Sequence, residues 1–243
     1  MFNFLEPSII LGLILFQSIF GVGLLMFGTP TFIMLGYNFP QTLTLLLPIS
    51  LTISSLQFLL STEKDKYFLW NFNLLCIPFL IMFLYITLNF YHVINFKLYI
   101  SLVIIFFSTI NIYRTKFFFK NKFNKVTEKI FLISIGTIHG LTNLGGSLLA
   151  IFSTLKSNSN KNLSRYYISY GYMMMSSIQI IILFFFEKEY FNLKNIYYIA
   201  AVFILYSPSQ KLFQKFKDKE FSKTINILAL TYGLIILTNS FLS

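Results

Sequence analysis

The sequence predicts an all-α polytopic membrane protein with about eight hydrophobic segments in two related halves. Hydrophobic residues make up 56% of the 243 residues and charged residues only 11%, whereas about a quarter of a soluble domain is charged. Most apolar segments are close in length to the roughly 20 residues that a helix needs to cross a bilayer. Two short motifs each occur twice, and duplicated motifs on interrupted apolar segments are typical of secondary transporters.

The apolar segments follow one another through the whole chain. They cover approximately residues 8–36, 40–60, 71–91, 96–113, 129–155, 163–186, 192–208 and 222–241. No linker between them is long enough to divide the chain into separate domains. We therefore expect a single transmembrane domain over residues 1–243, with repeat one at about 8–113 and repeat two at about 129–241, as a multi-pass protein of the cell's inner (cytoplasmic) membrane.

The first and fifth segments are too long for simple spanning helices, and each has glycines near its middle. A straight helix of about 29 residues would be about 43 Å long, against a hydrocarbon core of about 30 Å. Two arms of about 12 residues would each reach about 18 Å, close to the midplane. A hairpin that enters and returns therefore fits the length at least as well as a tilted helix. We expect re-entrant, broken-helix hairpins in both segments, in the first because it is the repeat counterpart of the fifth. Non-helical backbone at that depth must be buried in protein or line a wet cavity.

The positions of the basic residues support re-entry of the fifth segment. If all eight segments cross, Lys and Arg divide 10 against 9 between the two sides; if the fifth re-enters, they divide 16 against 3. Because Lys and Arg concentrate in cytoplasmic loops, the second arrangement is preferred. It places the loops Arg114–Lys129 and Ser157–Arg165 on the cytoplasmic side, with Arg165 as an anchor at that surface. With both hairpins each half crosses three times, so the halves form an inverted repeat.

Charge and cysteine content restrict the partners. A net charge of +11 would suggest nucleic acid in a soluble protein, but here it is explained by the cytoplasmic loops. We expect a lipid bilayer and no nucleic acid as partner, and no cofactor or metal. The single cysteine, Cys76, excludes an intrachain disulfide.

The repeated motifs mark the candidate site. Residues 20–25 read FGVGLL and residues 144–149 read LGGSLL, 124 positions apart; residues 54–57 read SSLQ and residues 176–179 read SSIQ, 122 positions apart. A half-helix that begins inside the membrane presents free N–H groups and a partial positive charge, which can hold an anion. Glycine lets the backbone turn and approach the ligand. We assign Gly21 and Gly23 to one tip and Gly145 and Gly146 to the other; close helix packing is the alternative role for these glycines.

Neutral hydrogen-bond donors accompany both tips, and they suit the acceptor oxygens of an anion. Gln57 and Gln179 are expected at equivalent positions facing one central cavity. His139 could carry a coupling proton, since its unperturbed pKa is about 6.5. The other candidate substrate-binding residues are Ser54, Thr142, Asn143, Ser147 and Ser176; hydrogen bonding between helices is the alternative role for the side chains.

At these residues the chain resembles the sulfite exporter TauE/SafE family, also called TSUP. The resemblance lies in IFGVGLLMFGTP (Ile19–Pro30), TLTLLLPISLTISSLQ (Thr42–Gln57) and HGLTNLGGSLL (His139–Leu149). It implies a non-enzymatic transporter of small, often sulfur-containing anions such as sulfite or organosulfonates. An anion channel is the nearest alternative. An intramembrane hydrolase using His139 and Ser147 is a more distant one, because no G-x-S-x-G motif occurs.

Overall fold

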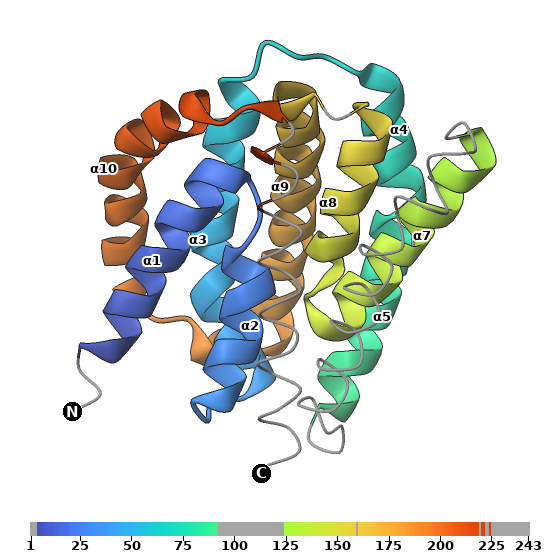
Figure 1. Cartoon of the computed structure of the whole chain (residues 1–243). Helices are drawn as coiled ribbons and strands as arrows, with labels where there is room; N and C mark the ends of the chain where they lie inside the picture. The colour runs from blue at the N-terminus through green and yellow to red at the C-terminus, as the bar shows by residue number, and fades with distance from the viewer. Residues whose placement is uncertain (1–3, 92–123, 159, 219, 222–223, 225–243) are drawn as a thin grey trace.

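The structure of the chain is a computed structural model that describes residues 4–91, 124–158, 160–218, 220–221 and 224. These residues form helices joined by short turns, with no strand among them. The helices lie roughly side by side as a bundle (Figure 1). They are α1 (Leu5–Phe20), α2 (Leu24–Met34), α3 (Phe39–Leu59), α4 (Lys66–Leu75), α5 (Ile77–Phe90), α7 (Lys125–Thr142), α8 (Gly145–Lys156), α9 (Lys161–Phe186) and α10 (Lys194–Lys215), with a 3-10 turn at Lys188–Tyr190.

The helices match the expected apolar segments wherever the structure describes them. Helices α4 and α5 continue one another, so that Lys66–Phe90 forms one span of 25 residues. This span, Phe39–Leu59 and Lys161–Phe186 are each long and apolar enough to cross a membrane. The expected segment 96–113, and 222–241 apart from one residue, lie outside the described residues.

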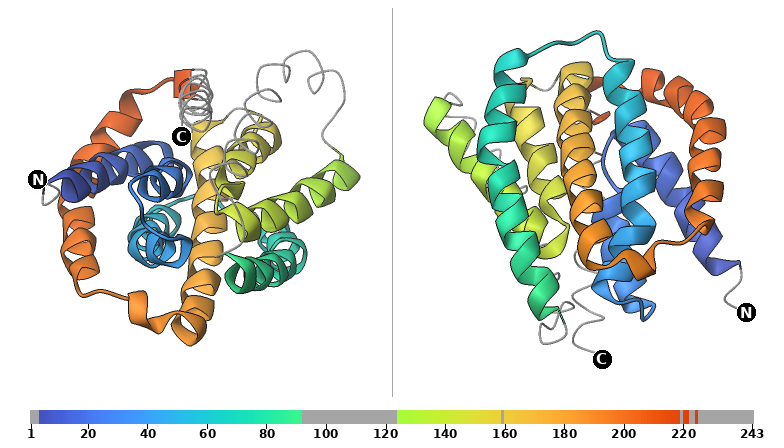
Figure 2. Two further views of the ribbon diagram at one scale, coloured as in Figure 1. Left: turned by 90° about the horizontal axis from the view of Figure 1, so that it is seen from below. Right: turned by 180° about the vertical axis from the view of Figure 1, so that it is seen from behind.

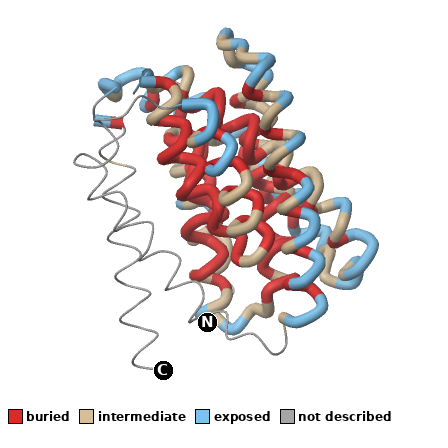
Figure 3. The backbone as a smooth tube through the Cα atoms, turned by 90° about the vertical axis from the view of Figure 1, so that its right-hand side faces the viewer, coloured by how far each residue is buried: buried red, intermediate tan, exposed pale blue. Residues whose placement is uncertain are grey.

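Helices α3 and α9 form the centre of the bundle and pack against each other along much of their length. Helices α1 and α10 lie on one side of this pair, and α5 and α7 lie on the other (Figure 2). Buried residues accordingly lie in the middle of the bundle, whereas exposed residues follow its outer edges (Figure 3).

Side-chain caps explain where several helices begin. Asn38 and Gln41 form a reciprocal capping box at the start of α3. Asp65, Asn124 and Asn160 accept hydrogen bonds from the first turns of α4, α7 and α9. Each cap satisfies backbone N–H groups that have no partner within the helix.

Both long, glycine-containing segments are broken into two helices that double back. Lys156 at the end of α8 donates to Glu128 in the first turn of α7, with Nζ and Oε1 2.7 Å apart. Tyr37, just after α2, donates to Glu6 in the first turn of α1 at 2.6 Å. Burial, together with this bond to Glu6, raises the pKa of Tyr37 to about 12, so the phenol stays protonated and can donate at neutral pH. Each polar contact therefore joins the two outer ends of a helical hairpin.

The two hairpins open at opposite ends of the bundle (Figure 1). Tyr37 stands two residues before the start of α3. Lys156 instead lies 3.9 Å from Asp65, which follows the end of α3. The tip of one hairpin therefore points towards the end at which the other hairpin opens.

The arms of the hairpins differ from the expected two equal arms of about 12 residues. Helix α1 has 16 residues and α2 has 11, while α7 has 18 and α8 has 12. At 1.5 Å per residue the first arms are about 24 and 27 Å long, longer than the about 18 Å expected for each arm. The breaks lie at Gly21 (φ 79°) and Asn143 (φ 61°), because glycine and asparagine are the residues that best tolerate the left-handed conformation.

Helix α7 packs closely on α5 through two glycines one turn apart. A Cβ atom on Gly136 would overlap the carbonyl oxygen of Cys76, and one on Gly140 would lie 2.7 Å from the carbonyl oxygen of Leu80. Small residues at this spacing let membrane helices touch backbone to backbone.

Gly136→Ala should therefore destabilise the fold by about 1–3 kcal/mol, because the added methyl group meets backbone that cannot move aside. Gly12→Ala is the matched control, since no heavy atom lies within 4 Å of a Cβ at Gly12. Thermal unfolding of the two purified variants checks this difference. Equal melting temperatures would contradict the close α5–α7 contact.

Candidate functional site

The two helix breaks correspond residue by residue at a single spacing. The left-handed caps Gly21 and Asn143 are 122 positions apart, as are Gln57 and Gln179. The same spacing relates Gly23 to Gly145. The expected alignment of FGVGLL with LGGSLL at 124 positions is therefore wrong by two residues, because the backbone geometry, rather than the count of glycines, defines the break.

At the first tip, three side chains from three different helices converge on the end of α1. Gln57 on α3 donates to the carbonyl oxygens of Gln17 (2.9 Å) and Ser18 (3.2 Å). Arg165 on α9 donates to the Ser18 oxygen at 2.9 Å, and Gln210 on α10 donates to it at 3.2 Å. All three meet the Ser18 carbonyl, which the helix end leaves without a backbone partner; the Gln17 carbonyl also accepts from the backbone N–H of Gly21 at 2.7 Å.

Gln17 is a site residue that the sequence analysis missed. Its side-chain amide donates to the hydroxyl oxygens of Ser50 (3.0 Å) and Ser54 (3.1 Å), and all three residues are fully buried. Ser54, a predicted ligand, is thus bound to Gln17 inside the bundle. Its position relative to the helix break could have identified it. Gln17 stands four residues before the cap Gly21, as His139 stands four residues before Asn143.

Arg165 is not the surface anchor that the sequence suggested. Only 8% of its surface is exposed, and its guanidinium carbon lies 4.2 Å from the ring centre of Phe213. Among the described residues no carboxylate lies within 4.0 Å of it, and its Nε has no hydrogen-bond partner. Arg165 lies only four residues after the start of α9. It is buried because α1 and α10 pack over the beginning of that helix.

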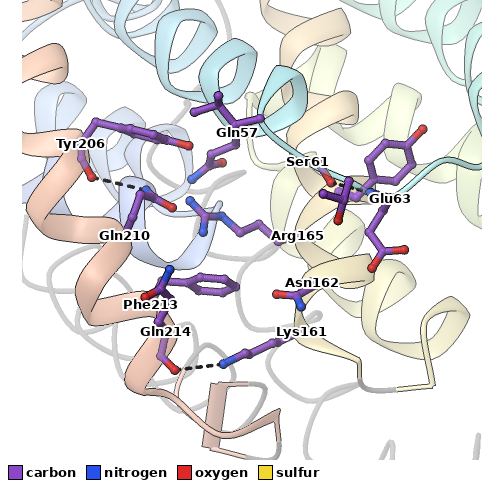
Figure 4. Close-up of a pocket in the computed structure, with 13 residues that line it drawn as sticks. Gln57, Ser61, Glu63, Lys161, Asn162, Arg165, Tyr206, Gln210, Phe213 and Gln214 are labelled. Carbon is purple, nitrogen blue, oxygen red and sulfur yellow. Dashed lines mark hydrogen bonds between the residues drawn. The ribbon is translucent and has the colours of Figure 1, made fainter.

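A cavity of about 490 Å³ opens beside Arg165. Its buried floor includes Gln57 and Arg165, while residues such as Thr62 and Gln214 form an exposed rim. The guanidinium of Arg165 lies between Gln57, Gln210 and Phe213 (Figure 4). The lining residues are Gln57, Leu60, Ser61, Thr62, Glu63, Lys161, Asn162, Arg165, Tyr166, Tyr206, Gln210, Phe213 and Gln214.

The cavity carries an excess of positive charge. Its cations are Arg165 and Lys161, against the single carboxylate of Glu63. Gly21 lies next to this floor: a Cβ there would be 3.5 Å from the Cγ of Arg165 and 3.6 Å from the Oε1 of Gln57. The cavity can therefore hold a small anion beside the first break.

At the second tip the predicted residues meet one another away from this cavity. Nε2 of His139 lies 3.1 Å from Oε1 of Gln179, and the His139 ring meets the ring of Tyr172 edge-on at 6.2 Å. Asn143 donates to the hydroxyl of Thr29 on α2 at 2.8 Å. This contact joins the tip of the second hairpin to the second arm of the first.

Several predicted binding residues have structural contacts of their own. Thr142 and Ser147 donate to the carbonyls of Ile138 and Leu144 within their own hairpin. A Cβ on Gly145 would lie 2.6 Å from the Cβ of His139, and one on Gly146 would overlap the hydroxyl of Tyr172. Gly23 combines a φ of 125° with close packing on Phe16. These contacts favour the packing role for Gly23, Gly145 and Gly146.

The two tips lie at different levels of the bundle. Arg165 and Gln179 are separated by 14 positions on α9, or about 21 Å along a helix. Gln57 lies at the level of Arg165, so the two glutamines do not face one central cavity as expected. The longer first arms of both hairpins explain this separation, because each tip extends past the other.

The geometry does not favour the hydrolase alternative. The Ser147 hydroxyl donates within α8, and Nε2 of His139 bonds to Gln179, so the two do not form a nucleophile–base pair. Within the described part of the chain, no group of three His, Cys, Asp or Glu side chains is close enough to hold a metal ion.

Replacing Gln57 by Leu should lower the free energy of unfolding by about 0.6–1.7 kcal/mol, between the average and the maximum found for hydrogen bonds between membrane helices. It removes a donor to two carbonyls at the end of α1. Thr52→Val is a control on the same helix, because the Thr52 hydroxyl bonds only to Pro48 one turn away in α3. Thermal unfolding measures both; an unaffected Gln57→Leu variant would show that α1 does not depend on this donor.

Comparison with protein-family models, curated proteins and solved structures gives no match to this chain. The resemblance to the TauE/SafE family therefore stays a prediction from the sequence motifs.

Proposed function

We propose that this chain is a secondary membrane transporter that moves a small anion, such as sulfite or an organosulfonate, across the cytoplasmic membrane by alternating access. The observation that carries the proposal is the buried Arg165, which has no carboxylate partner among the described residues and lies at the floor of a cavity of about 490 Å³, next to a broken helix. Broken helices at which substrates bind are a recurring device of secondary transporters.

The surface of the bundle supports a bilayer environment. Large apolar side chains are exposed on its outer helices and at the end of α9, whereas soluble proteins rarely expose extended apolar patches. Three helices have the length and hydropathy of membrane spans. The exposed apolar residues include Leu11, Leu15, Trp70, Leu74, Ile81, Met82, Phe184, Phe185, Phe203 and Ile204.

The arrangement of the hairpins supports an inverted repeat. Equivalent residues of the two halves are 122 positions apart, and the two broken-helix hairpins open at opposite ends of the bundle. The end with Lys156, Lys161 and the cavity also carries described residues of the basic loops, among them Lys129 and Lys217. By the positive-inside rule this end is cytoplasmic, and the cavity represents a state open to the inside.

The cavity is suited to an anion rather than to a cation or a neutral solute. In a site of low dielectric a guanidinium without a carboxylate partner attracts an anion much more strongly than it would in water. Guanidinium also matches the planar edge that two oxygens of an oxyanion present. Gln57 and Gln210 are further amide groups at the same wall. A floor closed by Gln57 and Arg165 favours a carrier over an open channel.

Cysteine labelling in a Cys76→Ala background tests the topology. Lys129→Cys and Asn162→Cys should react from the cytoplasmic side, and Phe4→Cys and Asn192→Cys from the opposite side, because all four positions are exposed and lie at opposite ends of the bundle. A membrane-impermeant maleimide applied to intact cells and to inverted vesicles distinguishes the two sides. Labelling of Lys129→Cys and Asn162→Cys from different sides would contradict the proposed hairpin.

Arg165→Gln should weaken sulfite binding ten- to a hundredfold, because a charged donor to a bound ion contributes about 1.5–3 kcal/mol. The readout is the sulfite-dependent rise in melting temperature of the purified protein. Lys211→Gln removes the same charge from an exposed position on α10 that does not line the cavity, and it should bind normally. Equal loss in both variants, or none in Arg165→Gln, would remove Arg165 from the site.

A further inference from the structure

At the second tip, a group of fully buried polar atoms has no hydrogen-bond partner among the described residues. They are Nδ1 of His139, Nε2 of Gln179 and the hydroxyls of Tyr172 and Ser176, and all four residues are 0% exposed. A buried polar group without a partner costs free energy, so a cluster of them points to a molecule that bonds to them.

These atoms belong to one place in the fold. Tyr172, Ser176 and Gln179 follow one another at spacings of four and three residues, and therefore share one face of α9. His139 reaches that face by its contact with Gln179 and by its edge-on contact with Tyr172. The Tyr172 hydroxyl lies against Gly146 in the first turn of α8, where the helix N-terminus adds a partial positive charge.

The free atoms define the ligand. Because Oε1 of Gln179 can only accept, Nε2 of His139 carries the proton in their hydrogen bond, and Nδ1 is the basic atom that is free. The two hydroxyls and the Gln179 amide are donors. The cluster thus offers three donors to an anion and one basic nitrogen to a proton.

Few other titratable groups surround His139. Tyr172 is the one that faces it from α9; α5 presents Leu80, Phe83 and Leu84 to the adjoining Gly140, and α2 presents Thr29 to Asn143. The charges of Glu128, Lys156 and Asp65 lie together at the opposite end of the α7–α8 hairpin. No carboxylate among the described residues is therefore placed to balance a charge on His139.

We propose that this cluster is a second anion site, which binds a small monovalent oxyanion together with a proton on Nδ1 of His139. Either ion alone would be an uncompensated charge in a buried site. Together they are neutral, so each must raise the affinity for the other by the same factor. The inference deepens the proposed function and rests on it, because binding with a proton would make the transport of a monovalent anion electroneutral.

The equivalent residues of the first repeat cannot bind an anion together with a proton, so the proposed site belongs to the second tip only. Gln17 occupies the position of His139, and Ser50 and Ser54 occupy those of Tyr172 and Ser176. There the amide of Gln17 is bonded to both hydroxyls, and no group titrates. His139→Gln therefore gives the second cluster the residue that the first already has.

Proton uptake by the purified full-length protein tests the proposal. Sodium methanesulfonate is added to the protein in unbuffered detergent solution with a pH indicator dye; methanesulfonate is the anion of a strong acid and does not itself buffer. We expect about one proton to be taken up per chain, with an affinity that rises about tenfold for each unit by which the pH falls. Binding of the anion without proton uptake, or no binding, overturns the proposal.

Two pairs of variants complete the test. His139→Gln should abolish proton uptake, whereas Arg165→Gln should keep it; uptake that persists in His139→Gln overturns the second site. In the His139→Gln protein, which keeps only the first site, methanesulfonate binding that the additional change Arg165→Gln does not weaken instead counts against the proposed function, so the two failures are distinguishable.

Tyr172→Phe removes a hydroxyl that has no hydrogen-bond partner in the described part of the chain, and it should weaken proton-coupled binding about tenfold with no loss of melting temperature. Tyr170→Phe is its matched control, since that hydroxyl donates to Asn73 at 3.0 Å; it should lower the melting temperature and keep the uptake. The reverse pattern would show that the Tyr172 hydroxyl has a structural role only.

Discussion

The satisfaction of backbone groups at the ends of the broken helices is the constraint on which the rest of the structure depends. A helix that ends inside an apolar bundle leaves carbonyl oxygens that water cannot reach, and each costs free energy unless a donor meets it. At the end of α1 the donors are Gln57, Arg165 and Gln210, from three different helices. These bonds draw α3, α9 and α10 together around the tip, and they leave the rest of the Arg165 guanidinium facing a cavity.

The same constraint is met differently at the second tip, and the difference gives the two halves different chemistry. Asn143 takes the left-handed position of Gly21, and its side chain reaches α2. His139 takes the position of Gln17, next to a tyrosine where the first repeat has Ser50. One tip therefore holds a permanent cation beside a cavity, and the other holds a basic nitrogen in a closed cluster. A transporter that binds an anion alone at one level and together with a proton at another would need this division.

The sequence predicts the helical segments well because length and hydropathy decide them. It also predicts that the first and fifth segments break, because their length and glycine content conflict with a single spanning helix. It does not predict where they break. The glycine pattern suggested Gly145 and Gly146 as the counterpart of Gly21 and Gly23, whereas the backbone turns at Asn143, and one-dimensional spacing cannot reveal which residue takes the left-handed conformation.

Tertiary contacts account for the other differences. Arg165 stands at the start of an apolar segment, where an interfacial anchor is the ordinary reading of an arginine; only the packing of α1 and α10 over that position buries it. Gln17 lies in a stretch whose hydropathy hides it, and its importance depends on Ser50 and Ser54 more than 30 positions away. Gln57, in contrast, was identified from the repeated motif, because both the motif and the contact belong to the duplicated unit.

Counterflow of radiolabelled sulfite is the most direct measurement of anion transport by alternating access. Purified protein is reconstituted into proteoliposomes loaded with unlabelled sulfite, and uptake of labelled sulfite is followed against liposomes without internal sulfite. A carrier exchanges one anion for another, so we predict saturable uptake that internal sulfite accelerates and that Arg165→Gln reduces. Uptake that neither saturates nor responds to internal sulfite would indicate a channel, and an absence of uptake would contradict sulfite transport by this protein.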